Sequence, residues 1–334
     1  MMNEELKKTL RSRHICVVIP TYNNDKTIKA VVEKSLLYCD DVIVVADGCT
    51  DDTMDILHDI DKITLVSYPQ NKGKGYALKV GFRKALDKGF SYAITLDGDG
   101  QHYPENIPLF LKANQKHPHA LIVGSRQLDG VCRSKGSSFA NKFSNFWFYV
   151  QTGKALDDTQ TGYRLYPLHK LYGLLFLTSR YEAELELLVF ASWHGVKIVP
   201  ISVQVYYPPR EERVSHFRPT KDFVRISVLN TVLCFLAIVY GLPLRLWRFF
   251  TSCLQTVYSL LFFLFFTLVV FTPFVWIYTK VGKMTEKKRY RLHQLIYFAS
   301  RFVMIHHGIP GTKFLSKVAE GVDFNKPRII ICNH

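Results

Sequence analysis

Short apolar runs alternate with helical patterns through residues 15–96, and this alternation limits the folds open to the chain. The runs ICVVI (15–19), VIVVA (42–46), ITLV (63–66) and YAITL (92–96) have the length of buried strands. Apolar residues at helical spacing separate them, as over residues 27–37 and 75–88. Repeated strand–helix pairs predict an α/β fold with a mostly parallel sheet.

Polar clusters follow three of these strands directly, at residues 21–25, 47–53 and 97–102. The carboxyl ends of parallel strands meet at one edge of a sheet, and ligands of such folds bind there. We therefore expect the three clusters to converge on one site.

Asp97 and Asp99 are the first candidates for chemistry, because they lie one residue apart on the turn after the fourth strand. Two carboxylates so placed can bind one hard cation, and Mg²⁺ or Mn²⁺ held this way keeps positions open for substrate phosphates. The alternative is an ordinary Asp–Gly turn without a metal. Gln101 and His102 extend the polar run and favour the functional interpretation.

The segment NKGKG (71–75) combines two glycines with Lys72 and Lys74. Glycine lets the backbone approach a phosphate closely, and lysine supplies positive charge. The segment is neither a Walker A loop nor a dinucleotide-binding fingerprint, because the residues that define those motifs are missing. Asp47, after the second strand, can accept a hydrogen bond from a nucleobase, whereas Asp51 or Thr50 fits the helix cap.

The segment DTQTGYR (158–164) offers a carboxylate, a glycine turn and an arginine. Asp158 is a candidate general base, and Arg164 a candidate phosphate ligand. Glu182 and Glu184 follow at the head of a predicted helix, where the helix dipole favours acidic residues without any catalytic role.

The composition divides the chain into residues 1–225, a mostly apolar stretch at 226–279 and a basic segment at 280–334. Residues 254–279 contain no charge and are long enough to span a bilayer, whereas 226–243 is only marginally so. The net charge of +15 is concentrated in basic residues on both flanks of this stretch. Such flanks favour a hairpin with both ends at the cytoplasmic face. The alternative is an interfacial helix at 226–250 followed by one span.

Other classes of protein find less support. No nucleic-acid-binding motif accompanies the positive charge, so we expect no nucleic-acid partner. The seven cysteines include no CxxC pair, which argues against a zinc site and fits reduced thiols in the cytosol. The N-terminus lacks the apolar core of a secretory signal.

Six segments, in this order, resemble the motifs of family 2 glycosyltransferases with the GT-A fold, and most closely those of the dolichyl- and polyprenyl-phosphate mannose and glucose synthases. They are VVIPTYNN (17–24), VVADGCTDDT (44–53), NKGKGYAL (71–78), TLDGDGQHYP (95–104), GSR (124–126) and DTQTGYRLY (158–166). The resemblance covers roughly residues 14–225. The chain departs from the family in Ala46, where a second aspartate often precedes Asp47.

The resemblance implies an inverting transfer of a sugar from a UDP- or GDP-linked donor to a membrane lipid, foremost a polyprenyl or dolichyl phosphate. For the donor, it implies a nucleoside pocket of Pro20, Tyr22 and Asp47, Lys74 near the base or phosphates, and Arg213 and His216 on a mobile loop over the donor. It implies that Asp97 and Asp99 bind the metal, with Gln101 as a third ligand, and that Arg126 and Arg164 neutralise phosphates. Asp158 would lie near the acceptor, and Glu184 would occupy a later acidic position of the family. A lipid hydroxyl or polysaccharide acceptor, and a catalytically idle membrane scaffold, are the alternatives.

Residues 321–334 (GVDFNKPRIIICNH) resemble the lead-in to the NHxxxxD motif of lysophosphatidate-type acyltransferases. The sequence stops at the histidine, so the partner aspartate is not included and we expect no acyltransferase activity from it. A fragment of a glycosyltransferase–acyltransferase fusion and a fortuitous apolar tail both fit this pattern.

Overall fold

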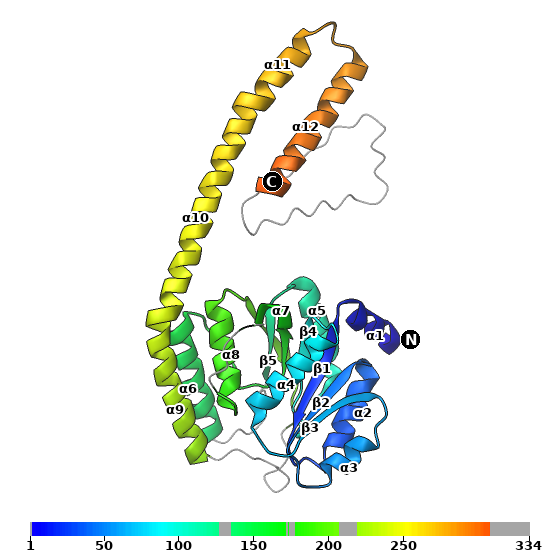
Figure 1. Ribbon diagram of the computed structural model, residues 1–334, viewed down its shortest axis with the longest axis vertical. Helices are drawn as coiled ribbons and strands as arrows, with labels where there is room; N and C mark the ends of the chain where they lie inside the picture. The colour runs from blue at the N-terminus through cyan, green and yellow to red at the C-terminus, as the bar shows by residue number, and fades with distance from the viewer. Residues whose placement is uncertain (1, 127–134, 172, 174–177, 207–218, 308–334) are drawn as a thin grey trace. The chain divides into compact units, whose positions relative to one another are not determined.

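The computed structural model describes residues 2–126, 135–171, 173, 178–206 and 219–307 (Figure 1). The chain divides into two units, Met1–Arg245 and Leu246–His334. The acyltransferase-like segment at 321–334 lies outside the described residues.

A seven-stranded sheet in the order β3-β2-β1-β4-β6-β5-β7 forms the centre of the first unit. Its strands are β1 (Ile15–Thr21), β2 (Val42–Asp47), β3 (Ile63–Tyr68), β4 (Tyr92–Thr95), β5 (Leu121–Arg126), β6 (Arg164–Pro167) and β7 (Ile198–Val203). β6 runs antiparallel to β4 and β5, and the other pairings are parallel. The predicted α/β class with a mostly parallel sheet is confirmed.

Helices cover both faces of this sheet, because alternate residues of its strands point to opposite sides. On one face Val18 and Val45 share a core with α4 (Lys74–Asp87) and α8 (Glu182–Trp193). On the other, Val17 and Val44 pack with α2 (Ile28–Tyr38) and α5 (Ile107–Lys116). Before residue 219 this unit also contains α1 (Met2–Ser12), α3 (Thr53–His58), the 3-10 turn η1 (Pro104–Asn106), α6 (Lys135–Thr152) and α7 (Leu168–Leu171).

One helix runs without interruption from the first unit into the second, through α9 (Pro219–Leu236), η3 (Ala237–Gly241), α10 (Leu242–Phe265), η4 (Phe266–Phe271) and α11 (Thr272–Lys280). η3 and η4 are π-helical turns, and each lies just before a proline, Pro243 or Pro273. Proline lacks the N–H of the regular helix ladder, and a wider turn accommodates it. The expected hairpin of residues 226–243 and 254–279 is therefore wrong, because the helix continues through Gly241 and Pro243.

The first part of this helix belongs to the globular unit. Leu229 and Leu233 are buried in the core beside α8. Arg245 donates from Nη2 to the carbonyl oxygen of Thr152 at 2.6 Å, which satisfies the end of α6. The first unit accordingly extends to Arg245.

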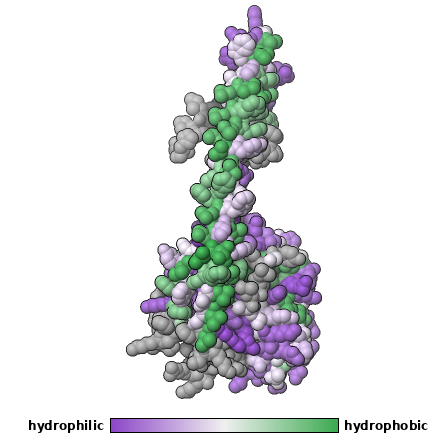
Figure 2. Space-filling model, turned by 60° about the vertical axis from the view of Figure 1, so that its left-hand side comes forward, coloured by the Kyte–Doolittle hydropathy of each residue, from purple (hydrophilic) through white to green (hydrophobic). Residues whose placement is uncertain are grey.

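Residues Val224–Lys280 form a helix of 57 residues that is long and apolar enough to cross a membrane, judged by length and composition. Figure 2 shows apolar side chains along its surface. At 1.5 Å per residue this helix extends for about 85 Å, against about 30 Å for a bilayer core, so only part of it can lie in lipid. A turn at 281–285 separates it from α12 (Glu286–His307).

Close contact between α4 and the sheet depends on Gly81, and its replacement provides a test of the fold. A Cβ atom at Gly81 would lie 2.5 Å from Cγ1 of Val18. We expect Gly81→Val to lower the free energy of unfolding by about 1–3 kcal/mol through overpacking. Lys84→Val, at an exposed position of the same helix, is the matched control. Equal stabilities of the two variants, measured by denaturant unfolding of the detergent-solubilised chain, would contradict this packing.

Candidate active site

The polar clusters that follow β1, β2 and β4 lie together, as the sequence predicted. Asn23 accepts the backbone N–H of Thr50 at 2.8 Å, which joins the first cluster to the second. Thr27, two residues beyond the first cluster, donates from Oγ1 to the carbonyl oxygen of Gly98 at 2.7 Å, which joins the segment after β1 to the third cluster. Three segments distant in sequence thus form one edge.

Asp47 organises the glycine-rich loop before α4. Its two carboxylate oxygens accept the backbone N–H groups of Lys72 and Gly73, at 2.7 and 2.8 Å. Gly73 has φ of 97°, a conformation that favours glycine. Asp47 is buried, so its carboxylate fixes the start of α4. Its contact with a nucleobase stays a prediction.

Lys74, the first residue of α4, lies between two carboxylates. Its Nζ is 2.7 Å from Oδ1 of Asp97 and 3.0 Å from Oε2 of Glu184. Burial acts to lower the pKa of Lys74, but the two carboxylates outweigh it and raise the pKa above its ordinary value. The ammonium therefore stays charged at neutral pH.

Gly162 lies directly against this ion pair. A Cβ atom there would be 2.6 Å from Nζ of Lys74 and 2.9 Å from Oδ2 of Asp97. The carbonyl oxygen of Gly162 accepts the hydroxyl of Thr95 at 2.6 Å, which ties this turn to β4. The glycine in the DTQTGYR segment thus leaves room for the ion pair, a role that the sequence did not indicate.

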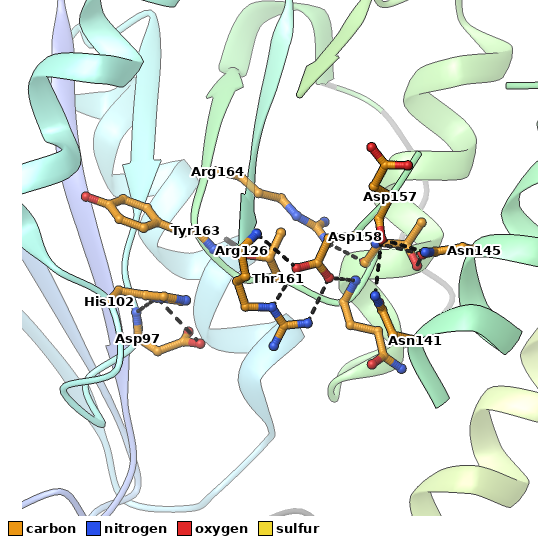
Figure 3. A network of polar contacts seen from close by, with 12 residues as sticks. Asp97, His102, Arg126, Asn141, Asn145, Asp157, Asp158, Thr161, Tyr163 and Arg164 are labelled. Atoms are coloured by element: carbon orange, nitrogen blue, oxygen red, sulfur yellow. Dashed lines mark hydrogen bonds and ion pairs between the residues drawn. The ribbon is translucent and has the colours of Figure 1, made fainter. Parts of the chain in front are cut away.

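Asp99 and His102 complete the turn after β4 (Figure 3 shows His102 beside Asp97). Burial, followed by the charge of Asp97, raises the pKa of Asp99 to about 6. His102 accepts the backbone N–H of Asp97 on Nδ1 at 3.1 Å. Burial lowers the pKa of His102 to about 4, so the ring is neutral at neutral pH. Gln101 donates its backbone N–H to Asp99 Oδ1 at 3.0 Å.

The chemistry of Asp97 and Asp99 fits a Mg²⁺ or Mn²⁺ ion. Both supply hard carboxylate oxygens, and the mutual repulsion that raises the pKa of Asp99 is relieved by a cation. Within the described residues no group of three or more His, Cys, Asp or Glu side chains could hold a metal. Two carboxylates leave coordination positions for water and substrate phosphates. Ligation by the Gln101 side chain stays a prediction.

Arg126 and Asp158 form a bidentate pair at the next edge of the site (Figure 3). Nε and Nη2 of Arg126 donate to Oδ2 and Oδ1 of Asp158 at 2.5 and 2.8 Å. Asp158 is buried. The sequence suggested separate roles for these residues, a phosphate ligand and a general base, and the structure couples them. Asn145 of α6, which the sequence did not single out, supports this turn by donating to the carbonyl oxygen of Asp157 at 2.6 Å.

Arg164 is fully buried in the structure. Its guanidinium donates to the carbonyl oxygens of Glu184 and Thr159 at 2.7 and 2.8 Å, so it holds α8 against the turn after Asp158. Its contact with a phosphate stays a prediction. Pro20 is buried in β1 and Tyr22 is half-buried just beyond it. Arg213 and His216 lie outside the described residues.

Comparison with known proteins agrees with this geometry. Residues 16–164 match the family model described as glycosyl transferase family 2. A UDP-N-acetylglucosamine–dolichyl-phosphate N-acetylglucosaminyltransferase from Methanococcus voltae is 28% identical over 216 residues, which cover 58% of this chain and 86% of the relative. A polyprenol monophosphomannose synthase from Mycolicibacterium smegmatis is 31% identical over 164 residues, covering 45% of this chain and 60% of the relative.

Among solved structures, glucosyl-3-phosphoglycerate synthase from Mycobacterium tuberculosis, in complex with Mn²⁺, uridine diphosphate and phosphoglyceric acid, has the same fold. The TM-score is 0.53 at 20% identity, and the match covers 70% of this chain and 82% of that one. This likeness shows that the first unit has the GT-A fold, and residues 16–164 are similar to glycosyl transferase family 2.

Proposed function

We propose that this protein transfers a sugar, with inversion, from a UDP- or GDP-linked donor to a polyprenyl or dolichyl phosphate at a membrane surface. The observation that carries the proposal is the convergence at one sheet edge of the segments that carry Asp47, Asp97 and Asp99, where Lys74 forms an ion pair with Asp97. The names of the two relatives, which act on dolichyl phosphate and polyprenol phosphate, support the acceptor class.

The donor would lie over the carboxyl ends of the strands, with its nucleoside toward Pro20, Tyr22 and Asp47. Asp97 and Asp99 would hold Mg²⁺ or Mn²⁺, which when bound supplies positive charge to the diphosphate leaving group. The acceptor oxygen forms a bond to the anomeric carbon as the bond from that carbon to the diphosphate breaks. The bonding electrons leave with the diphosphate.

A phosphate acceptor suits the state of the acidic residues. Asp158 is bound to Arg126, and Glu184 and Asp97 share Lys74. An ionised lipid phosphate has no proton to lose, so it needs no general base. A lipid hydroxyl would need one, and Asp158 could serve only by exchanging its arginine partner. Arg126 would then turn from Asp158 toward the incoming phosphate.

The exposed helix supports membrane attachment. Residues 254–279 carry no charge, and the basic residues beyond Lys280 follow directly. A continuous span separates the two basic flanks, so only one can face the cytoplasm. We assign the cytoplasmic face to the catalytic domain, because charged nucleotide donors do not cross a bilayer unaided.

Asp99→Asn tests reaction class and acceptor together. We expect the purified, detergent-solubilised chain to transfer sugar from one member of a panel of UDP- and GDP-sugars to polyprenyl phosphate, but not to diacylglycerol. The substitution should slow transfer by about 100-fold, the scale of losing one electrostatic contact to the developing charge. Asp61→Asn, at an exposed turn, should leave the rate unchanged. Transfer to diacylglycerol alone would overturn the phosphate acceptor.

A double substitution tests whether Asp158 acts as the partner of Arg126 or as an independent general base. We expect Asp158→Asn and Arg126→Gln each to slow transfer, and the combined variant to be no slower than the slower single one, because the pair acts as a unit. Asp157→Asn is the control, since only the main-chain carbonyl of Asp157 makes the contacts described above. Rate losses that multiply in the double variant would identify Asp158 as a base acting independently of Arg126.

Alkaline carbonate extraction tests the membrane span. We expect the full chain to stay in the membrane pellet, because a charge-free helix long enough to cross the bilayer is retained when peripheral contacts are broken. A wash in high salt serves as the comparison, since salt screens basic residues on an anionic surface. Release by carbonate would indicate an interfacial helix, and release by salt alone an electrostatic attachment.

A further inference from the structure

Glu184 connects two parts of the site that are distant in sequence. Its carboxylate binds Lys74 at 3.0 Å, and its main-chain carbonyl accepts Nη1 of Arg164 at 2.7 Å. Glu184 is only 6% exposed. Its second carboxylate oxygen, Oε1, is buried and has no hydrogen-bond partner within the described part of the chain. If the Lys74 ammonium moves toward Glu184, this second oxygen can accept a further hydrogen bond from it.

Lys74 and a divalent cation compete for the same carboxylate. Oδ1 of Asp97 is 2.7 Å from Nζ, so the ammonium already neutralises the residue expected to bind the metal. Bringing a divalent cation to Asp97 adds like charge beside Lys74 in a poorly screened site. This repulsion between the cation and Lys74 becomes weaker if the ammonium can move toward another anion. Among the contacts of Lys74 in the structure, that anion is Glu184.

We infer that Glu184 is a positioning residue that tunes the affinity of the site for its divalent cation, by sharing Lys74 with Asp97. The inference rests on the metal-dependent function proposed above and deepens it. When the cation binds, the Lys74 ammonium moves toward Glu184, and this leaves the Asp97 carboxylate free to coordinate the cation. Glu184 is buried and contacts Lys74 in the structure, whereas a contact of Glu184 with substrate stays a prediction.

The affinity of the purified full chain for Mn²⁺ measures this effect without catalysis. Electron paramagnetic resonance reports the concentration of the free ion, in the presence of uridine diphosphate. We expect Glu184→Gln to weaken Mn²⁺ binding by about tenfold or more, the scale seen when a residue behind a metal ligand is replaced. Glu182→Gln is the matched control. It changes a buried glutamate on the same helix, two positions away and thus on another side.

A double-substitution cycle tests whether Glu184 acts through Lys74. Lys74→Met removes the competing ammonium and should tighten Mn²⁺ binding. In that background Glu184→Gln should change Mn²⁺ affinity by less than about twofold, the scatter expected without coupling. A tenfold loss that persists without Lys74 would overturn the inference, because Glu184 would then act on the cation directly.

The outcomes separate this inference from the proposed function. If the unaltered chain binds no Mn²⁺, with or without UDP or GDP, the metal-dependent function fails and the inference fails with it. If it binds Mn²⁺ and Glu184→Gln binds as well, the inference alone fails. Near-ultraviolet circular dichroism and thermal unfolding of each variant identify loss of structure. If Lys74→Met does not fold, Lys74→Gln, which keeps a polar group between the carboxylates, takes its place in the cycle.

Discussion

The ion pairs of Lys74 are the interaction on which the catalytic end of this domain depends. A half-buried ammonium in a poorly screened site is costly unless its charge is matched, and here two carboxylates match it. One comes from the turn after β4 and the other from α8, so the charge requirement draws the two together. Gly162 completes the arrangement, because only a residue without a side chain fits against the pair.

In the other polar contacts of the site, each charged side chain is likewise bound by an opposite charge or by backbone groups. Asp47 uses both oxygens on the backbone of the loop that precedes Lys74. Arg126 and Asp158 neutralise each other, and Arg164 is bound by main-chain carbonyls. Matched charges of this kind hold side chains in place before a substrate binds, which in enzymes reduces the reorganisation needed when charge develops during a reaction. On the function proposed above, an anionic donor and an anionic acceptor would then exchange partners within this network.

The long helix Val224–Lys280 begins inside the domain and is long and apolar enough to cross a membrane, judged by length and composition. Its first part is a structural element of the domain, with Leu229 and Leu233 in the core and Arg245 at the end of α6. Its later part carries exposed apolar side chains such as Phe263 and Leu268. The proline positions are accommodated by π-helical turns in place of breaks.

The sequence by itself determined the strand–helix alternation, the convergence of three polar clusters on one edge, and the apolar helix, because each of these depends on local periodicity and on the geometry of parallel sheets. It also indicated Asp97, Asp99 and Lys74 as members of one site. Only the tertiary structure decided that Glu184 shares Lys74 with Asp97, that Arg126 holds Asp158, and that Arg164 is buried. These are contacts between residues far apart in the chain, and no local pattern specifies which buried charges will neutralise one another.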